Sequence, residues 1–269
     1  MYKITLTLLG LTVLFSLNAQ QHREAGIRKN LFLDVGGSYS SFQDTKYSDV
    51  REGGMGAFLE LGFSHFKRGK HFWEPGFSFN IASEHAATHD QATSLVMYIN
   101  PYFKYLKGLN DKIYVGGRVD LLNNYIRVYT NLTNNSTFAT FGNSLYGSFL
   151  YRTRLSEKWQ FQAMADLALI GVQSESPGFA MNYKQKRIEK GEVDYQDPGM
   201  GDPNTYAYAR FTHPGNNFIL KTQYSFLFRK RISLSYNWQM QRFSVVSGYP
   251  TTWGLHNLVF RVNILHREK

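Results

Sequence analysis

The amino-acid sequence predicts an all-β protein: a closed antiparallel transmembrane β-barrel of about ten strands, with short turns at one end and long loops at the other. Apolar and polar residues alternate with a period of two along about ten segments, and the connections between these segments alternate between short and long. Aromatic residues make up 16% of the chain and charged residues 19%. The chain contains no cysteine, which excludes disulfide scaffolds, thiol nucleophiles and cysteine zinc sites.

Residues 1–19 have the three-part pattern of a cleavable secretory signal. Lys3 is followed by an apolar stretch from Ile4 to Leu17, and small Ala19 precedes Gln20. The apolar centre is too short to span a bilayer comfortably, and no other segment approaches ~18 consecutive apolar residues. We therefore expect residues 1–19 to be removed and residues 20–269 to form the barrel.

The first five predicted strands lie in the amino-terminal half of the chain. They cover residues 31–39, 57–64, 73–81, 95–104 and 113–121. In the second of them, Leu59, Leu61 and Phe63 alternate with Glu60 and Gly62. Successive side chains of a strand point to opposite faces, so this pattern gives one apolar and one polar face.

The last five predicted strands follow the same rule. They cover residues 145–154, 159–169, 218–228, 232–241 and 258–264. In the fourth of this group, Ile232, Leu234 and Tyr236 alternate with Ser233 and Ser235. A length of about ten residues is what a tilted strand needs to cross a bilayer.

A soluble β-sandwich also alternates, but its exposed faces carry many Lys and Glu residues. Here the polar faces are rich in Gly, Ser, Asn, Gln and Tyr. Bulky rings also stand near one end of their strands, as an interfacial aromatic girdle requires. The predicted girdle residues are Trp73, Tyr105, Trp159 and Phe228.

The connection lengths favour the barrel more strongly. Short turns are predicted at 67–70, 109–111, 156–158 and 229–231, and long connections at 41–53, 83–94, 123–140, 172–215 and 244–255. This asymmetry is typical of bacterial outer-membrane barrels, with short periplasmic turns and long extracellular loops. Closure pairs every strand edge, which the bilayer demands.

The mature chain thus resembles the small bacterial outer-membrane β-barrels, including ten-stranded ones of the omptin type. The resemblance is architectural and compositional and rests on no family signature. Such chains often end on an aromatic residue, whereas here Phe260 and Ile264 are followed by His266, Arg267, Glu268 and Lys269. The resemblance implies a location in the outer membrane of a Gram-negative cell envelope.

If the apolar stripes face lipid, the polar faces line the lumen. The predicted lumen polar network consists of Asp34, Glu60, Glu74, Lys104, Arg118, Asp120, Arg152, Arg154, Asp166, Lys221 and Arg261. A barrel of about eight strands is filled by its own side chains, whereas water-filled porins need roughly sixteen. We therefore expect the lumen to be closed by paired charges.

The net charge of +10 is concentrated at the predicted short turns. The basic periplasmic rim comprises Lys67, Arg68, Lys70, Arg229, Lys230 and Arg231. Its field should favour anionic headgroups or an acidic periplasmic partner, while solubility during periplasmic transit is the alternative reason for such charge. The partners expected are outer-membrane lipids, lipopolysaccharide or a larger outer-membrane or periplasmic complex.

The resemblance to omptin-like proteases, which keep carboxylates and a histidine at the loop rim, makes that rim the expected place for any catalytic chemistry. Glu84, His85, His89 and Asp90 lie together there. His85 and His89 are four residues apart, a spacing that brings two imidazoles to one metal ion only if the segment is helical. The alternative is a solvated polar loop. Ser64 and His65 are adjacent, so they point to opposite faces of their strand. We therefore assign no catalytic residue, no metal and no cofactor.

The longest predicted connection contains a basic run at 184–190, followed at once by the acidic residues Glu192, Asp194 and Asp197. This mixture indicates a solvated loop near anionic lipopolysaccharide and argues against nucleic-acid binding. The function expected is a non-enzymatic surface binding or accessory, structural role in the cell envelope. The alternatives are a narrow channel for small solutes and a lipid- or peptide-modifying barrel enzyme.

Overall fold

A computed structural model describes residues 27–45, 50–86, 89–129, 137–175, 208–229, 231–246 and 249–268. The strands are β1 (Ile27–Asp44), β2 (Glu52–Lys67), β3 (His71–Ala86), β4 (His89–Gly108), β5 (Ile113–Asp120), β6 (Asn124–Tyr129), β7 (Thr137–Arg154), β8 (Trp159–Glu175), β9 (Tyr208–Thr212), β10 (Asn217–Phe228), β11 (Ile232–Val246) and β12 (Tyr249–Glu268). Within these ranges no helix is long and apolar enough to cross a membrane.

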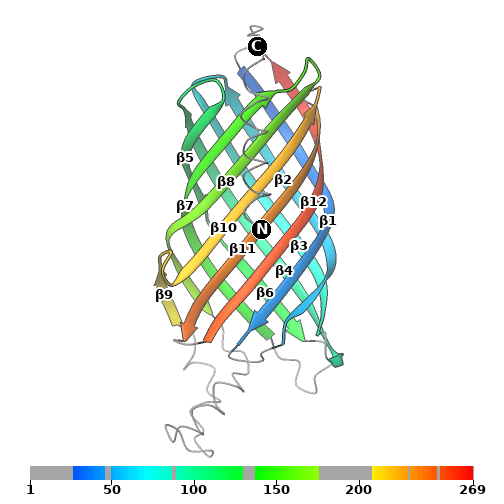
Figure 1. Ribbon diagram of the computed structural model, residues 1–269, viewed down its shortest axis with the longest axis vertical. Helices are drawn as coiled ribbons and strands as arrows, with labels where there is room; N and C mark the ends of the chain where they lie inside the picture. Colours follow the sequence, from blue (N-terminus) through cyan, green and yellow to red (C-terminus); the bar gives the residue numbers. More distant parts are fainter. Residues whose placement is uncertain are drawn as a thin grey trace, which may run out of the picture.

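The strands form one closed antiparallel barrel with 10 strand positions, as the sequence predicts (Figure 1). β5 and β6 follow each other between β4 and β7, and β9 and β10 follow each other along β8, so each pair fills one position. The wall closes where β1 pairs with β12, from Arg28 opposite Glu268 to Asp44 opposite Thr251. The pairing of β1 with β12 joins the first and last strands of the sheet, and such closure is the condition for a sheet to stand in hydrocarbon.

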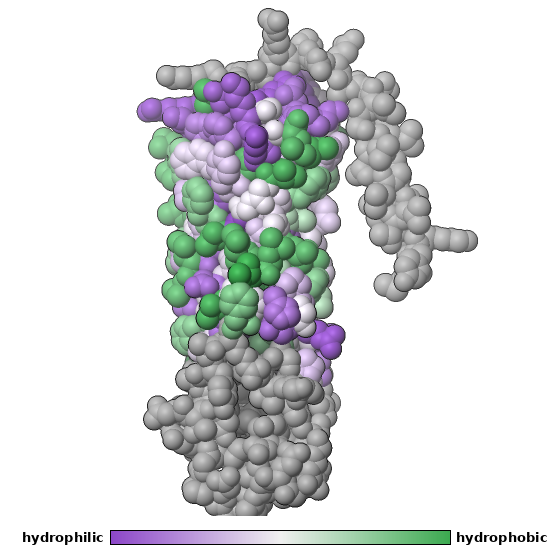
Figure 2. Space-filling model, turned by 90° about the vertical axis from the view of Figure 1, so that its left-hand side faces the viewer, coloured by the Kyte–Doolittle hydropathy of each residue, from purple (hydrophilic) through white to green (hydrophobic). Residues whose placement is uncertain are grey.

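The wall is apolar outside and polar inside. Val35 is 51% exposed while its neighbour Asp34 is 1% exposed, and Phe103 is 43% exposed beside Lys104 at 1%. A water-soluble protein would show the reverse distribution. Figure 2 shows the result: hydrophobic residues gather in a band over the middle of the wall, and hydrophilic residues cover the short-turn end above it.

The strands extend further toward the loop end than the sequence predicts. β3 and β4 are separated by residues 87–88 alone, where a loop over 83–94 was expected, and β11 and β12 are separated by 247–248, where 244–255 was expected. Similarly, β6 and the start of β7 occupy much of the predicted connection 123–140. Beyond the apolar band both faces of a hairpin can be polar, so the alternation that marks a strand loses its contrast.

The opposite end is closed by the short turns that the sequence predicts. In the β2–β3 turn, Gly69 has φ 65°, and the Lys70 amide donates to the Lys67 carbonyl at 3.0 Å. Glycine adopts this left-handed conformation without the clash that a Cβ would bring. Arg229 has φ 45° in the β10–β11 turn, where the Arg231 amide donates to the Phe228 carbonyl at 3.1 Å.

Candidate functional site

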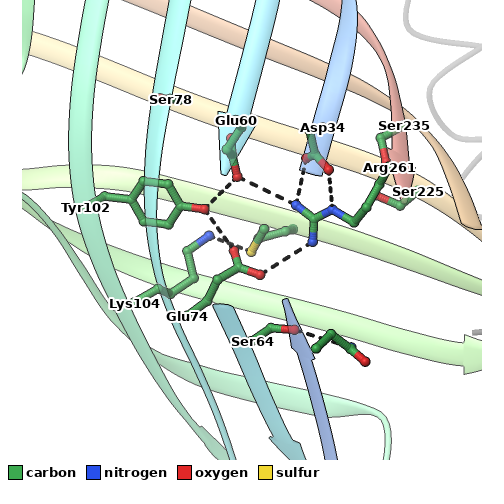
Figure 3. Close-up of polar contacts among 12 residues, drawn as sticks. Asp34, Glu60, Ser64, Glu74, Ser78, Tyr102, Lys104, Ser225, Ser235 and Arg261 are labelled. Carbon is green, nitrogen blue, oxygen red and sulfur yellow. Dashed lines mark hydrogen bonds and ion pairs between the residues drawn. The ribbon is translucent and has the colours of Figure 1, made fainter. Parts of the chain in front are cut away.

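The lumen holds most of the charged residues that the sequence predicts for it. The strand register explains how distant residues meet there: Asp34 of β1 lies opposite both Glu60 of β2 and Arg261 of β12. Since directly opposite residues of a sheet share one face, all three side chains point inward. Figure 3 shows this group converging from neighbouring strands.

Arg261 is the centre of the first cluster. Its guanidinium donates to both Asp34 oxygens, from Nε to Oδ1 at 2.7 Å and from Nη2 to Oδ2 at 2.8 Å. Two longer ion pairs reach Glu74 Oε2 at 3.5 Å and Glu60 Oε1 at 3.6 Å. Tyr102 donates toward Glu60 Oε1 at 2.6 Å and also lies 3.1 Å from Glu74 Oε1. One guanidinium and one phenol thus hold three inward carboxylates.

A second cluster lies across the lumen and is rich in cations. Asp120 of β5 accepts from Arg118 Nε at 2.6 Å and from Lys221 Nζ at 2.5 Å. Asp166 of β8 pairs with Lys104 Nζ at 3.1 Å and with Arg118 Nη1 at 3.4 Å. The pairs of Lys104 with Asp166 and of Asp120 with Lys221 join β4 to β8 and β5 to β10, so they tie together strands that are not neighbours in the sheet.

The two clusters form one network through Tyr102. The Arg118 guanidinium lies 4.1 Å from the centroid of the Tyr102 ring, whose hydroxyl belongs to the first cluster. Asp120 is 0% exposed and Asp166 2% exposed. A buried charge left without its partner costs several kcal/mol, so such a network constrains the relative positions of its strands.

The short-turn end of the lumen is filled by apolar side chains. Phe66, Phe72, Leu106, Tyr114 and Leu150 form a buried cluster against which Met164 packs. The Tyr114 hydroxyl accepts a hydrogen bond from the Gly69 amide at 2.9 Å, which joins this cluster to the β2–β3 turn.

Two predicted lumen residues stand at this same end. Arg152 lies 4.0 Å from the Phe66 ring centroid and donates to Gln160 Oε1 at 2.8 Å. Arg154 lies instead at the β7–β8 turn, where it donates to the carbonyls of Ser156 and Glu157. Its position at the end of β7 therefore separates Arg154 from the central network.

Sequence reasoning missed a third charged cluster at the loop end. Arg127 of β6 pairs with Glu52 of β2 and, at 3.2 Å, with Glu84 of β3. The Ser40 hydroxyl donates to Glu84, and the Arg127 guanidinium lies 4.4 Å from the Phe42 ring centroid. Glu52, Glu84 and Arg127 lie within the predicted loops 41–53, 83–94 and 123–140, and only their alternation with outward neighbours could have indicated the lumen.

This cluster corrects the interpretation of the loop rim. Glu84 is fully buried in the lumen, whereas His85 is exposed and lies 3.4 Å from the Thr93 hydroxyl. The side chains of His89 and Asp90 lie outside the described residues. Among the described residues, no group of three His, Asp or Glu side chains could hold a metal ion.

A small cavity remains between the charged clusters. Its volume is about 70 Å³, and its lining includes Glu60, Asn100, Lys104 and Lys221. Neither side-chain atom of Asn100 has a protein partner in hydrogen-bonding geometry, although this residue is 0% exposed. Polar walls around a space of this size are suited to a few ordered waters.

The outer wall carries the predicted girdle. Trp73 pairs across the sheet with Tyr105, and the rings of Trp159 and Phe228 lie 4.9 Å apart near the short-turn end. A second ring cluster was not predicted. Tyr39, Tyr236 and Trp238 surround His256, with Tyr236 Oη 2.6 Å from His256 Nδ1.

The second ring cluster lies nearer the loop end. On β1, Lys29 lies opposite His65, which lies opposite Trp73 of the girdle, so about 33 Å of strand, or ~25 Å of height at a typical tilt, separates Tyr39 from the level of Trp73. That height matches the apolar band of an outer-membrane barrel. Two interfacial belts thus bracket the hydrophobic wall.

The basic rim lies at the short-turn end, as its sequence positions require. Arg68 pairs with Asp111 at 2.9 Å across two turns. Lys67 belongs to the end of β2, Lys70, Arg229 and Arg231 are exposed, and Lys230 lies outside the described residues. The predicted signal peptide and the basic run at 184–190 also lie outside them.

No protein-family model matches the sequence, and no curated protein matches it. Among solved structures, the chain is similar to the outer-membrane protease OmpT from Escherichia coli, with 6% identity, 94% of this chain and 99% of that chain covered, and a TM-score of 0.46. It is also similar to the translocator domain of the autotransporter NalP from Neisseria meningitidis, with 9% identity, 95% of each chain covered and a TM-score of 0.41. Such low identities transfer no activity.

The closed wall, its apolar outer band and its polar interior define the class of the protein. It is a transmembrane β-barrel of the bacterial outer membrane.

Proposed function

We propose that the protein is a non-conducting, non-enzymatic barrel that serves as a surface binding or accessory protein of the outer membrane. The observation that carries this proposal is the filled lumen. Five carboxylates, Asp34, Glu60, Glu74, Asp120 and Asp166, share it with four cations, Lys104, Arg118, Lys221 and Arg261. A solute would have to break these ion pairs in order to pass.

The size of the barrel supports the same proposal. Ten strand positions lie close to the limit at which side chains fill a barrel, far below the roughly sixteen of water-filled porins. The apolar cluster around Phe66 and Tyr114 lies between the network and the short-turn end. A rigid, plugged barrel is suited to present its rims and outer wall to lipids, lipopolysaccharide or other envelope proteins.

The described loop rim offers little support for an enzyme. Inside the lumen, the Glu84 carboxylate forms an ion pair with Arg127 and accepts a hydrogen bond from Ser40. It therefore points away from His85, which is exposed on the outer face. A general acid–base pair requires both groups within reach of the same substrate. A lipid- or peptide-modifying activity therefore ranks below binding.

Two measurements test the proposal together. The full-length protein is isolated from native membranes in mild detergent, and vesicles containing it are tested for swelling in small sugars. We expect a stoichiometric lipopolysaccharide or protein partner and no swelling. Swelling at a porin-like rate would favour the channel. Hydrolysis of lipids or peptides that is lost in His85→Ala would favour the enzyme. Either result contradicts the proposal.

A further inference from the structure

The outer wall at the short-turn end carries a patch of cations and rings on neighbouring strands. The register aligns one cross-strand row from Arg267 of β12 through Lys29 of β1, His65 of β2 and Trp73 of β3 to Tyr105 of β4. All five side chains share the outer face, because directly opposite residues of a sheet do so.

A second row lies one step nearer the rim. Lys67 of β2 lies opposite His71 of β3, which lies opposite Lys107 of β4. The two rows together place Lys29, Lys67, Lys107 and Arg267 around a set of rings. We call these two rows the basic–aromatic patch.

The rings of the patch form a continuous stack. His65 stacks on Trp73 with centroids 5.4 Å apart and on His71 at 5.2 Å. His71 in turn stacks on Tyr105 at 6.5 Å. Amphipathic rings of this kind occupy the headgroup level of a bilayer.

The cations of the patch are not neutralised within the described part of the chain. None of Lys29, Lys67, Lys107 and Arg267 makes an ion pair there. Lys29, Lys107 and Arg267 are exposed, and no acidic residue occupies either row. The positive field of the patch therefore faces outward.

The wall becomes apolar immediately on the membrane side of the patch. Leu31 lies opposite Phe63, whose ring is 5.2 Å from that of Trp73, and Phe103 is 43% exposed two residues from Tyr105. Along β2 and β4 the order is thus cation, ring, hydrocarbon: Lys67, His65 and Phe63 on β2, and Lys107, Tyr105 and Phe103 on β4. This is the order of phosphate, glycerol and acyl chain in a phospholipid.

We propose that the basic–aromatic patch is a binding site for an anionic phospholipid of the adjoining leaflet. The phosphodiester lies among Lys29, Lys67, Lys107 and Arg267, the glycerol region lies over the stacked rings, and the acyl chains lie along Leu31, Phe63 and Phe103. A free anion would make no use of the apolar surface beside the cations. An acidic protein could bind the cations without contacting that apolar surface. The site is independent of whether the lumen conducts.

The test uses the full-length protein in phosphatidylethanolamine vesicles that contain a trace of spin-labelled phosphatidylglycerol or spin-labelled phosphatidylethanolamine. The fraction of immobilised label gives the relative affinity for the two lipids. We expect a preference for phosphatidylglycerol that falls about thirtyfold in Lys67→Gln/Lys107→Gln, because each of the two cations near an anionic headgroup contributes roughly one kcal/mol. Raised salt should reduce the preference of the unaltered protein.

The matched control is Arg51→Gln/Arg242→Gln, which removes the same charge from exposed residues outside the patch. It should retain the preference. An equal loss in the control, an unchanged preference in the patch variant, or displacement of the lipid by soluble glycerol phosphate would overturn the proposal. If Lys67→Gln/Lys107→Gln fails to fold, Lys29→Gln/Arg267→Gln tests the same site.

Discussion

At the scale of single residues, the balance of charge around Arg261 matters most. Its guanidinium contacts Asp34, Glu60 and Glu74, so three carboxylates rely on one cation. Replacing Arg261 by Gln should destabilise the barrel by about 3–5 kcal/mol, because it leaves buried carboxylates without their counter-charge. The measurement is the urea midpoint of unfolding for protein in lipid vesicles.

Glu60→Gln is the matched control for Arg261→Gln. It removes one of the three carboxylates and leaves an amide that can still accept from Tyr102. Its stability should change by less than ~1 kcal/mol. If the two variants lose the same stability, the network does not depend on charge balance.

At the scale of strands and turns, the β2–β3 turn depends on a left-handed residue. Gly69→Ala should cost about 1–2 kcal/mol, because its φ of 65° is strained for a residue with a Cβ. Gly37→Ala is the control, since a Cβ there meets nothing within 4 Å. The urea midpoint of unfolding should fall for Gly69→Ala and stay the same or rise for Gly37→Ala. Equal losses of stability in the two variants would contradict this account of the turn.

The sequence predicts strands well wherever one face is apolar and the other polar. It placed Leu59 outward and Glu60 inward, and it gave the short turns near their observed positions. It failed for Glu52 and Glu84, because Arg51 and His85 on the outer face beside them are polar too, and for Arg127, because its strand β6 is only 6 residues long and shows too little alternation to stand out. It also could not pair Arg261 with Asp34, since alternation gives the face of a residue but not its partner 227 positions away.

At the scale of the whole molecule, the even number of strand positions gives a testable topology. Both ends of the barrel domain and the short turns should lie in the periplasm, with the connection between β8 and β9 at the cell surface. An epitope inserted beside Gly199, which lies outside the described residues, should bind antibody on intact cells. Binding only after permeabilisation would reverse the orientation.

The filled lumen is the central claim about the molecule, and single-channel conductance in planar bilayers tests it most directly. A matched variant, Phe66→Ala/Tyr114→Ala, shortens the apolar cluster, while Phe103→Ala removes a ring of similar size from the outer wall. The unaltered protein and Phe103→Ala should show no steady open level at neutral pH, and the double variant should conduct more than either. Reproducible open levels in the unaltered protein would contradict the account.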